Sequence, residues 1–242
     1  SGFRRAGKSS LVHNLIKKTL NKKFKFQNIL YLNFEDYRFA SINSLVKLDE
    51  AYQYFLNFSA DMDSPKLLIF DEIQNIPDWD KFARTLADYN QQDQIILTGS
   101  NSEMLSSELG TNLGGRFIEF KLLPFSFKEF IRYKGFTVSE LNEAPMKRSA
   151  LFYDYFNKGG LIDVHNINND QTRADFIDGI ISKIILDDVV KRFNIRNATA
   201  IELILKFIFA NIGKPLSPSK LTKYFKELNI NIEEDTIADY LL

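Results

Sequence analysis

Residues 2–9 read GFRRAGKS, which is the spacing Gly-x-x-x-x-Gly-Lys-Ser, and they constrain the architecture more strongly than any other stretch. Gly2 and Gly7 allow the backbone to turn so that successive N–H groups face inward and can cradle phosphate oxygens. Lys8 can then reach the β- and γ-phosphates, and the Ser9 hydroxyl can ligate Mg²⁺. The pattern therefore predicts a phosphate-binding P-loop in which Lys8 is also a catalytic side chain.

A helix should follow this loop at once, because the N–H groups and the dipole at a helix N-terminus bind anions. Residues 11–20 do carry apolar side chains at helical spacing. The residues expected to bind the nucleotide are Gly2, Phe3, Arg4, Arg5, Ala6, Gly7, Lys8, Ser9 and Ser10.

The composition is that of an ordinary folded protein and excludes several classes of function. The 242 residues are 45% hydrophobic and 26% charged, with 31 basic and 31 acidic side chains. A net charge of zero makes no global case for binding nucleic acid or an anionic membrane. The absence of cysteine excludes disulfides and thiolate metal sites. No apolar run approaches the roughly 18 residues that span a bilayer, so we expect a cytoplasmic protein without a membrane segment.

Short apolar runs alternate with helical patterns over the first half of the chain. Three runs are typical of strands covered on both faces, and an alternating run predicts a fourth strand: 29–34, 67–70, 95–98 and 117–122. Helical patterns lie between them at about 42–59, 79–90 and 102–109. This alternation predicts an α/β fold with a parallel sheet of βαβ units.

The second half of the chain has helical patterns only. They cover 126–134 and approximately 144–157, 172–193 and 198–212. Polar or proline-containing connectors at 164–171 and 213–219 separate some of them. We expect domain boundaries near 124–140 and near 213.

Two carboxylates stand at the end of the second predicted strand. Asp71 would hold Mg²⁺ together with Ser9, commonly through a water molecule. Glu72 would orient or deprotonate the attacking water. Adjacent carboxylates after a strand are common in turns, but a P-loop upstream with one strand between makes them indicative of nucleotide hydrolysis.

Three further candidates have two interpretations each. Ser100 and Asn101 follow the third predicted strand, where they could contact the γ-phosphate or the lytic water, or could cap the next helix. Arg116 follows Gly114 and Gly115 and could neutralise transition-state charge, in its own subunit or in a neighbouring one. Alternatively, Arg116 could pair with a surface carboxylate.

Taken together, these motifs resemble those of the prokaryotic AAA-type ATPases that carry a C-terminal domain of unknown function. The similar stretches are 2–9, 68–74, 97–102, 113–116 and 123–130. The resemblance implies an additional-strand P-loop sheet, binding of ATP and Mg²⁺, slow hydrolysis, and a helical C-terminal region with a winged-helix unit. It divides the chain into an ATPase domain at 1–130, a helical region at 131–212 and a partial winged-helix unit at 213–242.

The ends of the chain depart from the family pattern. The family has a central strand leading into Gly2, and the sequence lacks it. Residues 240–242 stop inside an apparent helix. We therefore expect the sequence to be a fragment of a longer protein.

Residues 217–242 have the spacing of a helix-turn-helix, with a turn at 229–232, but this unit is poorly suited to reading DNA. Its second helix, from Glu233 onward, contains only acidic charged side chains, which a phosphate-lined groove repels. Three lysines of the preceding helix could contact a phosphate backbone: Lys220, Lys223 and Lys226.

The sequence thus predicts a Mg²⁺-dependent ATPase whose nucleotide state alters its C-terminal region, with a protein partner or self-association as the expected interaction. The alternative is a nucleotide-gated regulator that binds DNA or a partner protein without significant turnover. A small-molecule kinase is disfavoured, because the pair Asp71 and Glu72 suits water as the phosphoryl acceptor.

Overall fold

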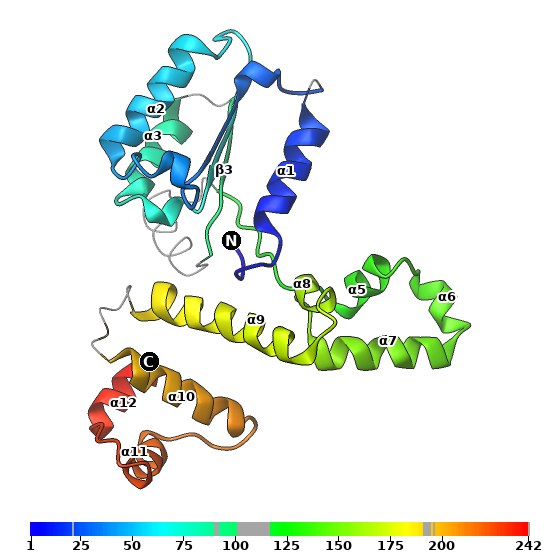
Figure 1. Ribbon diagram of the computed structural model, residues 1–242. Helices are drawn as coiled ribbons and strands as arrows, with labels where there is room; N and C mark the ends of the chain where they lie inside the picture. The colour runs from blue at the N-terminus through cyan, green and yellow to red at the C-terminus, as the bar shows by residue number, and fades with distance from the viewer. Residues whose placement is uncertain (21, 90–91, 101–116, 191–194, 196, 242) are drawn as a thin grey trace. The chain divides into compact units, whose positions relative to one another are not determined.

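The computed structural model describes residues 1–20, 22–89, 92–100, 117–190, 195 and 197–241 (Figure 1). The chain divides into two compact units, Ser1–Asn168 and Asn169–Leu242. Each unit is described by itself below. The three-domain division at 130 and 212 stays a prediction.

The first unit is built on a parallel sheet of three strands in the order β1-β2-β3. The strands are β1 (Ile29–Asn33), β2 (Leu67–Asp71) and β3 (Gln94–Leu97). Every residue of the central strand β2 is buried, as expected for a strand covered on both faces. Asn33 lies opposite Asp71, and Leu97 lies opposite Phe70, so the carboxyl ends of the strands meet at one edge. The predicted parallel sheet is confirmed.

Helices cover both faces of this sheet (Figure 1). On one face α1 (Lys8–Thr19) packs through Val12 against Leu67 and Ile69. On the other face α2 (Leu45–Phe58) and α3 (Trp79–Tyr89) pack through Leu48 and Trp79 in a larger cluster. Short 3₁₀ turns complete the connections: η1 (Phe26–Asn28), η2 (Tyr37–Phe39) and η3 (Ile73–Asn75). The arrangement is compatible with a P-loop α/β fold, and the additional-strand assignment stays a prediction.

The expectation of a fourth strand at 117–122 is wrong. These residues form only an isolated parallel bridge, between Leu122 and Gly2. A cavity of about 800 Å³, lined by β3, α1, α3 and residues 117–122, lies beside the edge of β3. Because paired strands lie roughly 4.8 Å apart, the segment cannot join the ladder across that cavity. The helix expected at 102–109 lies outside the described residues.

Residues 117–122 instead run beside the start of the chain. The Ser1 amino group donates to the carbonyl of Phe120 at 3.0 Å, and the Leu122 N–H donates to the carbonyl of Ser1 at 2.8 Å. A Cβ at Gly2 would lie 2.5 Å from the Leu122 carbonyl oxygen, so this close approach requires glycine. Gly2 therefore has a packing role in addition to the turn it permits.

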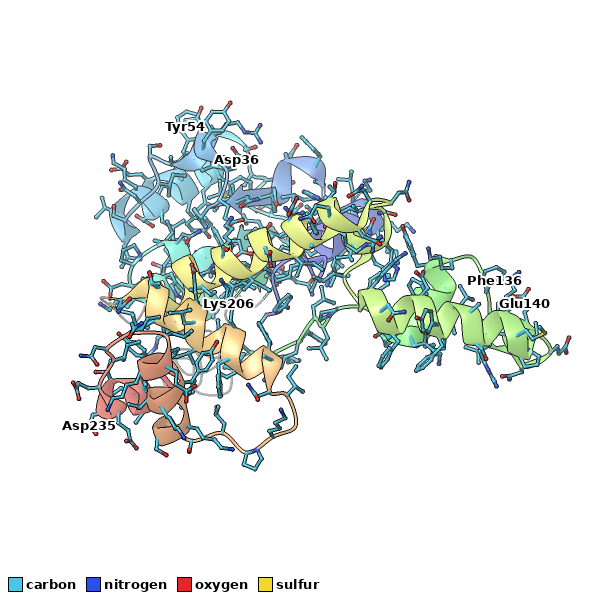
Figure 2. The ribbon with its side chains drawn as sticks, turned by 60° about the horizontal axis from the view of Figure 1, so that its bottom comes forward. Asp36, Tyr54, Phe136, Glu140, Lys206 and Asp235 are labelled. Carbon is cyan, nitrogen blue, oxygen red and sulfur yellow. The ribbon has the colours of Figure 1, made fainter. Side chains whose placement is uncertain are left out.

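Short helices follow to the end of the first unit: α5 (Phe127–Tyr133), α6 (Val138–Asn142), α7 (Pro145–Lys158) and α8 (Ile162–His165). Capping boxes begin α5 at Ser126 and α6 at Thr137, whose Glu140 partner is labelled in Figure 2. The buried His165 packs on the ring of Phe130 with centroids 4.5 Å apart.

The described part of the second unit is helical. Its elements are α9 (Asp170–Lys183), the π-helix η4 (Ile184–Val190), α10 (Ala198–Ala210), α11 (Pro218–Glu227) and α12 (Glu234–Leu241). Helices α10, α11 and α12 share a core that contains Ile204, Phe225 and Ile237. Acidic side chains of α12, including Asp235, are exposed (Figure 2). The winged-helix assignment is not confirmed by this arrangement and stays a prediction. No helix in the described parts of either unit is long and apolar enough to cross a membrane.

Candidate nucleotide-binding site

The loop before α1 contains two residues with left-handed backbone angles. Gly7, the N-cap of α1, has φ 95°, and Arg5 has φ 62°, both in the left-handed region. Left-handed residues in such a loop turn successive N–H groups towards one side. Since α1 begins at Lys8, the N–H groups of its first turn follow this loop directly.

The Lys8 side chain is held between the loop and Glu72. Its ammonium group donates to the Gly2 carbonyl at 3.1 Å and pairs with Glu72 Oε1 at 3.2 Å. The side chains of Lys8 and Glu72 are 8% and 9% exposed, so this ion pair is buried. The loop lysine and the carboxylate expected to activate water are therefore in direct contact.

Asp71 is fully buried and accepts hydrogen bonds from hydroxyl groups on three sides. Ser9 Oγ and Tyr31 Oη both donate to Oδ2 at 2.8 Å, and Thr98 Oγ1 donates to Oδ1. The two residues expected to hold Mg²⁺, Ser9 and Asp71, are thus in contact across 62 positions of sequence.

The oxygen donors of Ser9 and Asp71 fit Mg²⁺. This ion keeps several water molecules and uses one or two protein ligands together with substrate phosphates. Within the described residues there is no cluster of three or more His, Cys, Asp or Glu side chains that could hold a metal. One carboxylate and one hydroxyl would leave the other positions on such an ion for water and phosphate oxygens.

Glu72 is fixed by the end of β3. It has the left-handed φ of 57°, and its N–H donates to Thr98 Oγ1 at 3.2 Å. Its Oε2 accepts from the Ser100 N–H at 3.1 Å and from Gln74 Nε2 at 2.7 Å. Ser100 thus lies beside Glu72, and its expected contact with the γ-phosphate or the lytic water stays a prediction. Asn101 and Arg116 lie outside the described residues.

The remaining loop residues divide between surface and interior. Phe3 and Ser10 are exposed, and Ala6 is buried. Arg4 Nη1 pairs with Glu35 Oε1 at 3.0 Å, and Arg5 Nη1 pairs with Asp163 Oδ2 of α8 at 3.2 Å.

Sequence reasoning missed Tyr31, Thr98 and Gln74. Burial, and then the hydrogen bond to Asp71, raise the pKa of Tyr31 above its ordinary value, so this hydroxyl keeps its proton and donates. The available signals were a hydroxyl inside an apolar run at Tyr31, a hydroxyl at the end of another at Thr98, and an amide two positions after Glu72. None of these signals indicates which residue the side chain will contact.

A parallel sheet with a glycine-bounded phosphate loop, and an Asp-Glu pair at its carboxyl edge, defines the class of P-loop nucleotide-binding proteins. Residues 1–131 match the AAA domain family, and residues 149–242 match a domain of unknown function, DUF8612. The first match covers more than half of the chain, so the chain belongs to the AAA domain family. The predicted AAA-type family and its C-terminal domain of unknown function are both confirmed.

Two relatives match along the whole chain. It is 33% identical over 242 residues to the uncharacterized protein MJ1544 of Methanocaldococcus jannaschii, a match that covers 99% of this chain and 52% of that protein. It is 29% identical over 242 residues to an uncharacterized protein of Haemophilus influenzae, a match that covers 100% of this chain and 58% of that protein. The chain therefore spans a little over half the length of these relatives.

Proposed function

We propose that this chain is the nucleotide-binding part of a Mg²⁺-dependent ATPase whose nucleotide state alters its C-terminal region. The observation that carries the proposal is the convergence of Lys8, Ser9, Asp71, Glu72 and Ser100 at one edge of the sheet. Membership of the AAA domain family supports it independently.

Each residue has a distinct role in this proposal. The amides of residues 2–10 and the Lys8 ammonium bind the phosphates, and Ser9 and Asp71 hold Mg²⁺, which would neutralise charge on the β- and γ-phosphates. Glu72 takes a proton from the attacking water as the water oxygen bonds to the γ-phosphorus. The bond to the β–γ bridging oxygen breaks and leaves its electron pair on ADP. Ser100 contacts the γ-phosphate or the lytic water.

Two more catalytic roles are proposed on sequence grounds. Asn101 would act beside Ser100 at the γ-phosphate. Arg116 would stabilise transition-state charge, in the same chain or in a neighbouring one.

The Arg5–Asp163 ion pair supports the proposed link to the C-terminal region. It joins the phosphate loop to α8, which is followed directly by α9 at the start of the second unit. Both side chains are about half exposed, so the pair contributes little to stability. The ion pair matters to the proposal because it connects the phosphate loop to α8. A change in the conformation of that loop on binding phosphate would therefore reach the segment that leads into the second unit.

Calorimetric titration of the full-length protein with ATP and Mg²⁺ tests the binding step. Lys8→Ala should weaken ATP binding by roughly 10- to 100-fold, because a hydrogen bond to a charged group contributes about 1.5–3 kcal/mol. Lys18→Ala, an exposed lysine on the same helix, is the matched control and should bind as the wild type does. Equal affinity in the Lys8 and Lys18 variants would contradict the proposal.

A second candidate is a nucleotide-gated regulator that binds duplex DNA. This candidate is favoured by two exposed lysines on α11, Lys223 and Lys226, and by the turn and α12 that follow them. The acidic residues of α12 argue against DNA binding. Phosphate contacts make affinity fall by about 0.9 log units per neutralised phosphate for each tenfold rise in salt. No duplex binding at low salt would eliminate this candidate.

A further inference from the structure

The two carboxylate oxygens of Glu72 have different kinds of partner. Oε1 faces the ammonium group of Lys8 at 3.2 Å. Oε2 accepts two hydrogen bonds, from Gln74 Nε2 at 2.7 Å and from the Ser100 N–H at 3.1 Å. Oε1 is therefore paired with a cation that bound phosphates would attract, whereas Oε2 is held by two uncharged donors.

The position of Gln74 is set by the turn that follows Glu72. The Ile73 N–H donates to the Thr98 carbonyl at 3.1 Å, which ties the turn to the end of β3. Gln74 Nε2 also lies 3.4 Å from Ser100 Oγ, so its amide reaches both Glu72 and Ser100. Its Oε1 is buried and has no hydrogen-bond partner within the described residues. The amide group is thus directed into the site rather than into solvent.

We propose that Gln74 is a positioning residue that holds Glu72 Oε2 while Lys8 transfers from Oε1 to the phosphates. This transfer leaves Oε1 as the oxygen that accepts the proton of the attacking water. The inference rests on the proposed ATPase function and adds to it a division of roles between the two oxygens. Without Gln74, the Glu72 carboxylate keeps one neutral anchor, the Ser100 N–H, and can rotate when Lys8 leaves.

The first test is the steady-state kinetics of Gln74→Ala. A misplacement of about 1 Å can cost 10²-fold in rate, so kcat should fall roughly 10- to 100-fold while KM for ATP stays within about twofold. Gln53→Ala is the matched control, because Gln53 is an exposed glutamine on α2 whose side-chain amide donates to Asp49 Oδ1. A Gln74→Ala enzyme with wild-type kcat would overturn the inference.

The second test is the kcat of Gln74→Met, which keeps the length of the side chain and removes the amide donor to Oε2. Loss of this donor should lower kcat about as far as in Gln74→Ala, whereas a side chain that only filled space would leave kcat at the wild-type value. A wild-type kcat in Gln74→Met would overturn the inference.

The outcomes separate this inference from the proposed function. If the wild type hydrolyses ATP and the Gln74 variants have the same kcat, the role of Gln74 is rejected and the ATPase proposal stands. A wild-type protein that binds ATP without hydrolysing it rejects both. If Gln74→Ala melts below the assay temperature, the kcat of Gln74→Met decides.

Discussion

Asp71 is the residue on which the proposed metal site depends, and its surroundings are made of hydroxyl groups. Ser9 belongs to α1, Tyr31 to β1, and Thr98 directly follows β3, so three separate segments fix one buried carboxylate. Fixed donors around a ligand hold it in one orientation. Ser9 would have to serve the metal as well, which leaves Tyr31 and Thr98 as the side chains that orient Asp71.

Tyr31→Phe should raise the Mg²⁺ concentration that nucleotide binding requires. Removal of the hydroxyl leaves Oδ2 of Asp71 with one fewer donor, and loss of such an outer contact lowers metal affinity by about 10-fold or more. Calorimetric ATP titrations at several Mg²⁺ concentrations measure this effect. Tyr37→Phe is the control, because Tyr37 is 86% exposed. An unchanged Mg²⁺ requirement in Tyr31→Phe would show that Asp71 needs no help from this hydroxyl.

The strands illustrate what could be predicted from sequence. Residues 29–34, 67–70 and 95–98 are apolar runs, and each forms a strand within one residue of its expected ends. Strand β2 is buried along its whole length, whereas most residues of β1 and β3 are half-buried. Residues 117–122 have an equally good alternating pattern, but a strand needs a partner at hydrogen-bonding distance, and a cavity lies at the edge of β3. An alternating pattern indicates that one face of a segment is exposed. It does not indicate whether a partner strand lies within hydrogen-bonding distance.

Site contacts between elements were harder to predict than the motifs themselves. Ser9 and Asp71 were expected to lie close together because both belong to known motifs, and their side chains are in contact. Tyr31 and Gln74 were missed, since their roles depend on which strands are adjacent and where each turn leads. The helix expected at about 42–59 begins at Leu45, because the Ser44 side chain caps it by accepting from the Lys47 N–H.

The attachment of α2 to the sheet can be tested by a pair of substitutions on that helix. Leu48 is fully buried in the main core cluster, so Leu48→Ala should lower the free energy of unfolding by about 2–5 kcal/mol. Val46→Ala, at a position that is 67% exposed, should change it by less than about 0.5 kcal/mol. Urea unfolding followed by circular dichroism measures both. Equal midpoints for the two variants would place α2 outside the core.

At the scale of the whole molecule, the chain combines a nucleotide-binding unit with a helical unit that matches a domain of unknown function. The proposed coupling runs from the phosphate loop through Arg5 and Asp163 into α8 and α9. Because the chain spans a little over half of its relatives, this coupling belongs in experiments on the full-length protein.

Hydrogen–deuterium exchange with and without ATP and Mg²⁺ tests this coupling. Bound phosphate should slow exchange of the backbone amides of residues 2–10, because those groups become hydrogen-bonded. Exchange in α8 and α9 should change as well, and Lys8→Ala should reduce both effects at the same ATP concentration, because it weakens ATP binding. Slower exchange at the loop with no change in α8 or α9 would contradict a nucleotide-dependent C-terminal region.

The central claim is that Glu72 activates water for ATP hydrolysis, and single-turnover release of phosphate from ATP tests it most directly. Glu72→Gln keeps the shape of the side chain but cannot accept the proton, so release should slow by about 10²- to 10⁴-fold. The same variant should bind ATP at least as tightly as the wild type, because Lys8 loses its ion pair with Glu72 and is free for the phosphates. Phosphate release from Glu72→Gln at the wild-type rate would contradict the account.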